Sequence, residues 1–528
     1  MSRRVLNGIV FLLVLIPSIQ YVWQSRDMPQ FAYLHDDGIL FVTAKSVAEG
    51  SYRIESFPDA PPQTKFPPLY PAYLSLIWQV NPNFPANLRV GTLFAWLPLA
   101  GYLLLAWLYY RKIGITEGRA WLLAALLGIN PYLLAFGGMM FSDVLFSCCV
   151  LAVMLALAGE GVAMAALAGA LAACAYLSRT AGIALLASVP LAMLWAGRKK
   201  AVFQKAVVFS APLLAAVIGW MWWTRTHTKT SVDLTTLYYT DYMRYLLRFD
   251  WNVLPSVLWK NIDQLLYSMG SMAVPRVFDA FFMKTLTQVV GVAMIVGTVR
   301  LVRRGGAGQY ASFALITSAI LLIWNFPPTE RFVVPLYPLL LAGLATEIEH
   351  LGKMLLGAFR KKDMGERVVA SGFLAAVVFL LGMGLALQVY MTFFYPRQAS
   401  AARVEKLRDQ RAAYQWISNN LPTSAKVLSY DDPLLYLYTG RRGHYLPLDP
   451  LWWYTEDHDS IRGSYRDVAA YSRSHGLEYI YFTSEDLSRE TGDEDRTAVQ
   501  RLVRENRELT PVFQAGIGTI YRVGPARP

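Results

Sequence analysis

Long apolar runs recur along the first three quarters of the chain and are separated by short polar segments. The first covers residues 5–23, and the next starts at about residue 88 and ends at Tyr110. Further apolar runs cover 121–135, 142–159, 162–177, 181–197, 207–223, 286–302, 311–326, 332–345 and 368–391. Runs approaching about 20 apolar residues are typical of membrane-spanning helices. The pattern predicts an α-helical polytopic membrane domain over residues 1–395, with about eleven spans.

Basic residues collect in the short loops between these runs and indicate an orientation. The basic groups are Arg3-Arg4, Arg111-Lys112, residues 198–200, Arg303-Arg304 and residues 360–362. Because cytoplasmic loops are enriched in Lys and Arg, we expect a cytoplasmic N-terminus and external loops at 24–87 and 224–284. No small-residue cleavage site follows the first run, so we expect it to be retained as a span.

Composition supports the membrane assignment. Of 528 residues, 55% are hydrophobic and only 16% are charged, whereas about a quarter is charged in an ordinary soluble protein. The net charge of +12 reflects the basic loops and does not indicate nucleic-acid binding. The three cysteines all lie in apolar runs, so they predict neither a disulfide framework nor a metal site.

From residue 397 the composition becomes that of a water-soluble domain. Apolar residues spaced along 404–417 predict a helix that ends at Asn420-Leu421-Pro422. Residues 426–430, 478–483 and 518–523 read as strands, with helical stretches at 462–475 and 497–505. We expect residues 397–528 to form an extracytoplasmic α/β domain on the same side as Asp36. Its histidines, His444, His458 and His475, fit no metal-ligand spacing and are interpreted as surface residues.

The first external loop holds two adjacent carboxylates and a lysine close to the predicted membrane surface. Asp36 and Asp37 precede a predicted short helix at 39–48, which either carboxylate could cap and which Gly50 would end. Lys65 lies just before Pro67-Pro68, and the apolar segment 69–80 is too short to span a membrane. This second segment is expected to be a helix lying in the interface.

These residues suggest chemistry at the outer face of the membrane. Asp36 and Asp37 could act as a general base, and Asp143, at the start of a span, is a third candidate. Lys65, Arg179 and Arg331 are cations that could bind and neutralise a phosphate. The competing interpretations are helix caps for the carboxylates and contacts with solvent or lipid headgroups for the cations. A site is favoured because all of these residues fall on one predicted side of the membrane.

A set of short motifs occurs in order along residues 1–395. They are Asp36-Asp37, Lys65-Phe66-Pro67-Pro68-Leu69-Tyr70, Ser142-Asp143, Arg179 within 177–182, and Glu330-Arg331-Phe332 followed by Pro335 and Pro338. In these motifs and their topology the chain resembles the GT-C superfamily of membrane glycosyltransferases, above all protein O-mannosyltransferases and lipid A aminoarabinose transferases. The first-loop pair is usually Asp-Glu in that family, and Phe66 separates Lys65 from the prolines here.

The resemblance implies a function and assigns roles to these residues. It implies an inverting glycosyltransferase that moves a hexose or pentose from a polyprenyl-phosphate donor to a hydroxyl acceptor at the outer face of a bacterial inner membrane. Asp36 would be the base by position, with Asp37 and Asp143 as further catalytic candidates. The donor phosphate would contact Lys65, Arg179, Arg331 and Tyr70. The acceptor, whether protein, lipid or glycan, stays open.

Cofactor and partner expectations follow from the same resemblance. A monophosphate donor needs less charge neutralisation than a diphosphate, so no cofactor is expected to be required. The adjacent Asp36 and Asp37 nevertheless keep a divalent metal open. Membrane lipid is an expected partner, and nucleic acid is not.

Two other classes of protein compete with the enzyme. A transporter or flippase of lipid-linked sugars would place charged groups at mid-bilayer in broken spans. A membrane sensor would use the C-terminal domain to bind a ligand. The charged residues of this chain lie at the ends of the apolar runs, which favours the enzyme.

Overall fold

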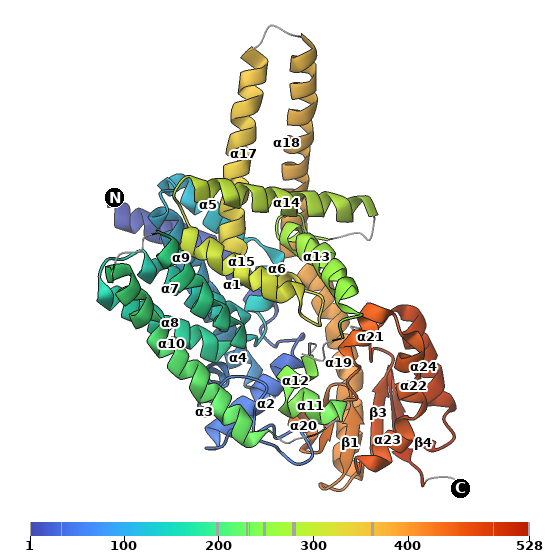
Figure 1. The fold of residues 1–528 in the computed structure, drawn as a ribbon. Helices are drawn as coiled ribbons and strands as arrows, with labels where there is room; N and C mark the ends of the chain where they lie inside the picture. Colours follow the sequence, from blue (N-terminus) through green and yellow to red (C-terminus); the bar gives the residue numbers. More distant parts are fainter. Residues whose placement is uncertain are drawn as a thin grey trace.

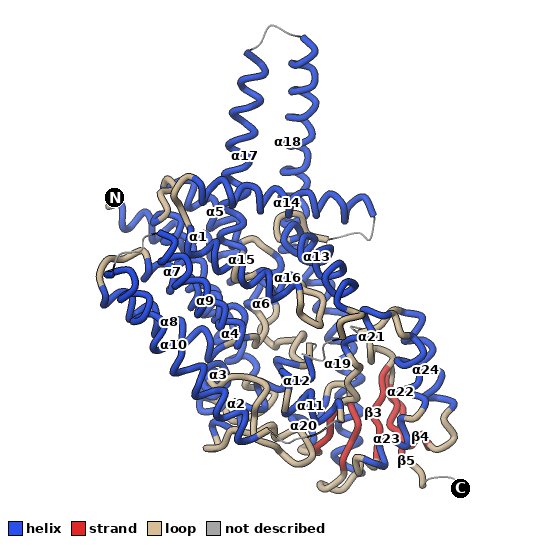
Figure 2. The backbone as a smooth tube through the Cα atoms, viewed as in Figure 1, coloured by secondary structure: helices blue, strands red, loops and turns tan. Residues whose placement is uncertain are grey.

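The computed structural model describes residues 2–32, 34–196, 200–228, 231, 233–246, 250–276, 281–360, 364–488 and 490–525. It is mainly helical, with one small sheet near the C-terminus (Figures 1 and 2). The helices of the predicted membrane domain are α1 (Arg3–Gln24), α4 (Leu88–Lys112), α5 (Glu117–Gly128), α6 (Pro131–Gly137), α7 (Ser142–Leu157), α8 (Val162–Ser178), α9 (Ala184–Ala196), α10 (Lys200–His227), α14 (Phe281–Arg303), α15 (Gly308–Leu322), α17 (Tyr337–Arg360) and α18 (Met364–Phe393).

Several of these helices are long and apolar enough to cross a bilayer. Among the described residues, five satisfy both conditions: α1, α4, α10, α14 and α18. A sixth span results if α5 and α6, which meet at a bend of 64°, count as one. Helices α7, α8 and α15 are apolar but shorter. At 1.5 Å per residue, 17 residues cover only about 26 Å of a core about 30 Å thick. The chain is a multi-pass membrane protein, and the total of about eleven spans stays a prediction.

Glycines allow α14 to cross two neighbouring helices closely. A Cβ atom on Gly270 of α13 (Leu254–Ser271) would lie 1.8 Å from the Thr287 carbonyl oxygen of α14. A Cβ on Gly297 of α14 would lie 2.0 Å from the Gly343 carbonyl oxygen of α17. Only glycine permits backbones to approach this closely, which is how packed helices in membranes gain contact.

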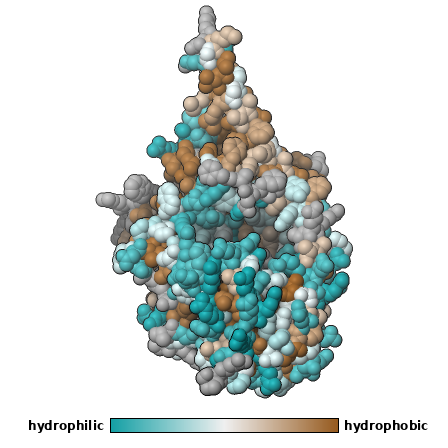
Figure 3. Space-filling model, turned by 90° about the vertical axis from the view of Figure 1, so that its right-hand side faces the viewer, coloured by the Kyte–Doolittle hydropathy of each residue, from teal (hydrophilic) through white to brown (hydrophobic). Residues whose placement is uncertain are grey.

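A helical hairpin formed by α17 and α18 projects from the body of the molecule (Figure 1). Its surface is largely apolar, and Figure 3 shows hydrophobic colours gathered on this projection and hydrophilic colours over the opposite end. Exposed apolar side chains on the projection include Leu356, Val368, Val369, Phe373 and Phe379. Such a surface suits contact with lipid.

The C-terminal part begins with the long helix α19 (Tyr395–Asn420) and contains a mixed five-stranded sheet. The strands are β1 (Lys426–Ser429), β2 (Arg442–His444), β3 (Tyr479–Thr483), β4 (Leu509–Ala515) and β5 (Gly518–Val523), in the spatial order β2-β1-β3-β5-β4. Strand β1 pairs in parallel with β2 and β3, and β5 pairs antiparallel with β3 and β4. Strands β1, β3 and β5 lie within the three predicted strands at 426–430, 478–483 and 518–523, whereas β2 and β4 were not predicted. The helices of this part are α20 (Asp432–Thr439), α21 (Pro450–Thr455), α22 (His458–Arg466), α23 (Val468–Ser474) and α24 (Asp493–Glu505).

Short helices from the loops after α1 and α10 lie beside this C-terminal part. They are α2 (Asp36–Ala48), α3 (Leu69–Val80), α11 (Leu234–Thr240) and α12 (Tyr242–Leu246), found together at the lower end of Figure 1. One hydrophobic cluster joins both regions, since Phe41 and Leu74 belong to it together with Tyr414 and Leu434. The C-terminal part therefore shares a core with the segment that holds Asp36. The predicted helix at 69–80 has the same bounds in the structure.

Candidate active site

Five charged side chains from distant parts of the chain meet in one cluster. Asp36 opens α2, Lys65 lies in the loop before α3, Asp143 is in the first turn of α7, Arg179 follows α8, and Arg331 lies in the short helix α16 (Glu330–Val333). We call these five residues the ion cluster. The sequence identified all five as candidates, and the structure brings all five together.

Arg331 is the residue that links the two carboxylates of the ion cluster. Its Nη1 lies 3.1 Å from Asp36 Oδ2, and its Nε donates to Asp143 Oδ2 at 2.7 Å. Arg179 donates to the other oxygen of Asp143. A planar guanidinium can hold two carboxylates at once in this way, which a lysine ammonium cannot do with the same geometry. The pKa of Arg331 lies above its usual value, because the two carboxylates outweigh the opposing effect of burial.

Lys65 is buried next to Asp36 and is surrounded by aromatic rings. Its Nζ is 3.3 Å from Asp36 Oδ1 and lies over the rings of Tyr238 and Tyr242, at 3.5 and 4.5 Å from their centroids. The Lys65 side chain has no exposed surface. Burial lowers the pKa of Lys65 to about 8, and the Asp36 carboxylate limits the fall. Cation–π contacts of this kind are stronger when water is excluded.

The ion cluster presents one accessible face. The side chains of Asp36, Arg179 and Arg331 are 21, 17 and 15% exposed, whereas those of Lys65 and Asp143 are 0 and 2% exposed. Burial opposes ionisation of Asp36, but Lys65 and Arg331 outweigh it and hold the pKa of the Asp36 carboxyl well below its usual range. A ligand that reaches the cluster therefore meets one ionised carboxylate flanked by two guanidinium groups.

Asp37 and Tyr70, the other two predicted site residues, are not part of the ion cluster. Asp37 is fully buried, and its Oδ2 accepts a hydrogen bond of 2.9 Å from the backbone amide of Ala32. The prediction that Asp36 or Asp37 caps the helix is wrong: both lie within the first turn of α2, and the cap position belongs to His35. Tyr70 is 1% exposed in the hydrophobic cluster shared with the C-terminal part. The roles predicted for Asp37 and Tyr70 stay predictions.

A buried polar network behind the ion cluster was not predicted from the sequence. His35 Nε2 lies 2.6 Å from Asp432 Oδ1, and His35 Nδ1 lies 3.0 Å from the Tyr238 hydroxyl. The Tyr239 hydroxyl donates to the same Asp432 oxygen at 2.6 Å. The only sequence signals were the tyrosine-rich segment before Tyr242 and an Asp-Asp-Pro sequence that reads as an ordinary start of a helix.

The histidines of the C-terminal part make separate contacts. His458 pairs with Asp495 at 2.7 Å, and His475 lies 3.4 Å from Asp233. The interpretation as surface residues is wrong for His444, which is 1% exposed, and burial lowers its pKa to about 4. Within the ranges that the structure describes, no group of three or more His, Cys, Asp or Glu side chains is placed to hold a metal ion.

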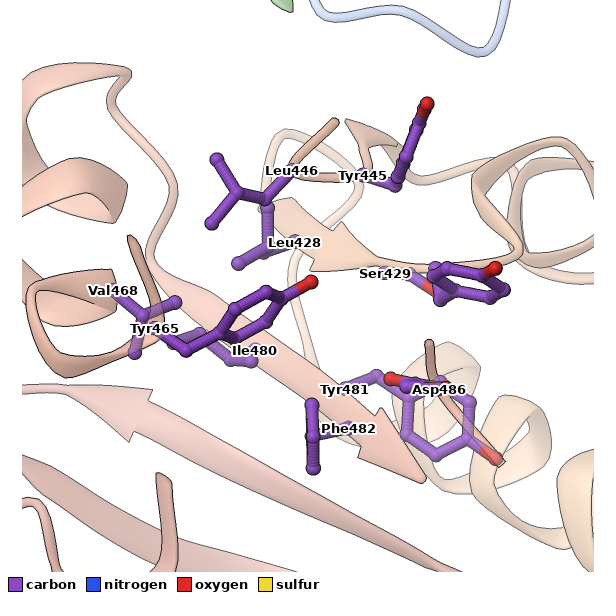
Figure 4. Close-up of a pocket in the computed structure, with 11 residues that line it drawn as sticks. Leu428, Ser429, Tyr445, Leu446, Tyr465, Val468, Ile480, Tyr481, Phe482 and Asp486 are labelled. Carbon is purple, nitrogen blue, oxygen red and sulfur yellow. The ribbon is translucent and has the colours of Figure 1, made fainter. Parts of the chain in front are cut away.

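The sheet of the C-terminal part encloses a small hollow, shown in Figure 4. Its lining comes from β1 and β3 and from α22, and it is mostly apolar, with Leu428, Tyr465 and Ile480 among the residues around it. The hollow has room for about one water molecule, which is too little for a substrate. The accessible face of the ion cluster is therefore the better candidate for an active site.

Comparison with known proteins finds likeness in the fold. The crystal structure of ArnT from Cupriavidus metallidurans bound to undecaprenyl phosphate superposes with a TM-score of 0.54 at 13% identity, covering 99% of this chain and 100% of that chain. The apo state of ArnT from the same organism gives a TM-score of 0.51 at 12% identity, covering 93% of this chain and 94% of that one. No family model matches the sequence, and no curated protein matches it.

Proposed function

We propose that this chain, a multi-pass membrane protein with the GT-C fold, is an inverting glycosyltransferase that uses a polyprenyl-phosphate-linked sugar. The observation that carries the proposal is the accessible face of the ion cluster, where Asp36 lies between two cations, Lys65 and Arg331, that come from two other segments. The fold shared with ArnT supports the donor class, because one of the two ArnT structures contains undecaprenyl phosphate.

The proposed reaction is a single displacement at the anomeric carbon of the sugar. Asp36 accepts the proton of the acceptor hydroxyl, the acceptor oxygen bonds to the anomeric carbon, and the bond to the phosphate oxygen breaks. Polyprenyl phosphate leaves with the bonding electrons, and one displacement inverts the configuration. Arg179 and Arg331 present the exposed positive charge for the phosphate, and Lys65 adds its charge from beneath.

Asp36 becomes a better base when the donor phosphate is in place. In the structure its oxygens are paired with Arg331 and Lys65, which depress its basicity. A phosphate beside Arg331 competes for the same guanidinium and adds negative charge near Asp36. Both effects raise the affinity of Asp36 for a proton. The acceptor is then activated mainly when the donor is bound.

The proposed reaction needs no metal ion. The carboxylate oxygens of Asp36 and Asp143 already face lysine and arginine, whose charges oppose binding of a divalent cation. Asp37 could have supplied a second metal ligand beside Asp36, but its Oδ2 accepts a hydrogen bond from the Ala32 amide instead. The cations of the ion cluster take the role that a metal would have.

We further propose a bacterial inner-membrane location with about eleven spans, a cytoplasmic N-terminus and an external C-terminal domain. Reporter tags after Pro528 and within 224–284 are expected to report an external location, and a tag near Arg360 a cytoplasmic one. Accessibility of the tags to a membrane-impermeant reagent provides the measurement. A cytoplasmic C-terminus would contradict the arrangement, because it would separate the C-terminal domain from an external Asp36.

Lys65 makes the use of donor dependent on pH. Below about pH 8 Lys65 carries its charge, and above this pH it loses the charge, so kcat/KM for the donor is expected to fall about tenfold per pH unit on the alkaline side. Lys65→Arg should remove this fall, because a guanidinium stays charged, but it should recover only part of the activity.

Lys65→Ala should lower kcat/KM for the donor more than kcat/KM for the acceptor. Initial rates at varied donor and pH decide this, and a Lys65→Ala defect confined to acceptor affinity would contradict it.

One assay separates the enzyme from the other two classes. The purified protein is incubated with a radiolabelled polyprenyl-phosphate sugar and a mixture of hydroxyl acceptors, and free polyprenyl phosphate is measured. We expect its release together with label in the acceptor fraction. Movement of intact donor across proteoliposomes without cleavage would instead indicate a flippase, and donor neither cleaved nor moved would favour a sensor.

A further inference from the structure

Next to the ion cluster, α20 of the C-terminal part packs closely against the start of α2. Pro433 of α20 lies so close to α2 that a Cβ atom on Gly38 would be 2.9 Å from Pro433 Cβ. The neighbouring segments add polar contacts, because Arg442 pairs with Glu55 at 2.8 Å and the Gly443 amide donates to the Ser56 carbonyl at 2.8 Å. The C-terminal part is thus fixed against the loop that holds Asp36.

Asp432, the first residue of α20, is the polar centre of this contact. Its side chain is fully buried, and among the described residues only its Oδ1 has hydrogen-bond partners, from His35 and Tyr239. A carboxylate buried with one oxygen unpaired is costly to fold. Since the carboxylate oxygen accepts, His35 Nε2 donates to it, and the Tyr238 hydroxyl lies 3.0 Å from the other ring nitrogen, Nδ1.

The network leads directly to the ion cluster by two routes. His35 is joined by the peptide bond to Asp36, and it has a backbone φ of 64°, which is strained for a residue with a side chain. Its two ring contacts help to hold that conformation. Through Tyr238, whose ring lies 3.5 Å from Lys65 Nζ, the same network reaches the partner of Asp36. The negative charge of Asp432 also helps to keep Lys65 protonated.

We infer that Asp432 is a positioning residue that holds the Asp36–Lys65 pair in place through His35 and Tyr238, making the C-terminal domain a part of the active site. The inference rests on the proposed function, since it places Asp432 behind the carboxylate assigned there as the base. The effect of Asp432 on the stability of residues 34–44 can be measured by hydrogen exchange, which does not require the protein to transfer sugar.

The first test measures amide hydrogen exchange of the full-length protein in nanodiscs. Asp432→Asn keeps the shape of the side chain but removes its charge, and it is expected to speed exchange in 34–44 several-fold. The matched control is Asp431→Asn, which removes the same charge one residue earlier, where the side chain contacts Gln410 instead of His35. Unchanged exchange at 34–44 in Asp432→Asn, or equal changes in both variants, would overturn the inference.

The second test uses Tyr238→Phe, which keeps the ring over Lys65 and removes only the hydroxyl that meets His35. Asp432→Asn and Tyr238→Phe are each expected to lower kcat by about 10- to 100-fold, because each should leave the Asp36–Lys65 pair misaligned. The double variant should lose no more than the worse single variant, because both substitutions break one chain of contacts. Losses that multiply would mean two unrelated structural defects. If Asp432→Asn does not yield folded protein, Tyr238→Phe alone should still speed exchange at 34–44, and normal exchange there would overturn the inference.

The third test compares pH profiles of donor kcat/KM. The charged and titratable groups facing Lys65 are Asp36 from α2, Tyr238 from α11, Tyr242 from α12, Arg331 from α16 and Asp432 from α20. Removing the Asp432 charge should move the alkaline fall to lower pH, whereas Asp431→Asn should leave it in place. An unmoved profile would contradict the part of the inference that concerns Lys65. A wild-type protein without transfer activity would refute the proposed function, and the exchange measurements would still decide the coupling.

Discussion

Asp36→Asn is expected to reduce sugar transfer by about two to four orders of magnitude, the usual cost of losing a general base. The amide keeps the size of the side chain but cannot take the proton of the acceptor. The variant should still bind polyprenyl phosphate at least as tightly as the wild type, because removing one negative charge leaves Lys65 and Arg331 freer for the phosphate. Single-turnover transfer and equilibrium binding of polyprenyl phosphate by the same preparation provide the two measurements.

The control for this experiment is Asp27→Asn, in the same loop. Asp27 pairs with Arg89 at 2.8 Å in an exposed contact, so its substitution should leave both transfer and binding unchanged. Near-normal turnover of Asp36→Asn would move the role of base to Asp143 or Asp37. Loss of transfer together with loss of phosphate binding would indicate a collapsed site instead of a missing base.

Arg331→Met is expected to reduce both the transfer activity and the stability of the protein strongly. Without the guanidinium, buried Asp143 keeps only Arg179, and Asp36 keeps only Lys65. Removing one partner of a buried ion pair costs about 3–5 kcal/mol, and the leaving phosphate also loses a charge-assisted contact. We expect a lower unfolding temperature and donor kcat/KM reduced by about a hundredfold or more.

Arg331→Lys separates charge from geometry. A lysine ammonium restores the charge but cannot hold Asp36 and Asp143 in the same fork, so it should recover stability only in part and little of the transfer. The control is Arg119→Met, which breaks an exposed pair with Glu349 and should leave stability and transfer nearly unchanged. Wild-type kinetics for Arg331→Met would show that the phosphate is bound elsewhere.

Much of the helical architecture could be predicted from the sequence because apolar runs report burial in lipid directly. The bounds of α3 agree with the pattern, and the superposition on ArnT supports the fold that the motifs predicted. The bend between α5 and α6 was missed, although Asn130-Pro131 lies at that break. Strand β2 was missed because three residues carry too little alternation to be recognised.

The membership of the ion cluster could also be predicted, since Asp36, Lys65, Arg179 and Arg331 share one side of the predicted membrane. Their geometry could not. Asp36 and Asp37 look equivalent in the sequence, but successive residues of a helix point about 100° apart, and the structure places the Asp36 carboxylate against Arg331. The contact of His35 with Asp432 has no local signal, because it depends on how two remote segments pack.

The span of sequence between these partners also sets an order of events during biosynthesis. Asp36 lies 295 residues before Arg331, and His35 lies 397 residues before Asp432. At about 5–20 residues per second, the loop that holds Asp36 leaves the ribosome about 20 to 80 s before α20 exists. Lys65 is available almost at once, but the remaining contacts form only as later segments are inserted. A nascent chain that stops before Asp432 would therefore hold Asp36 and Lys65 without the contacts behind them that come from α20.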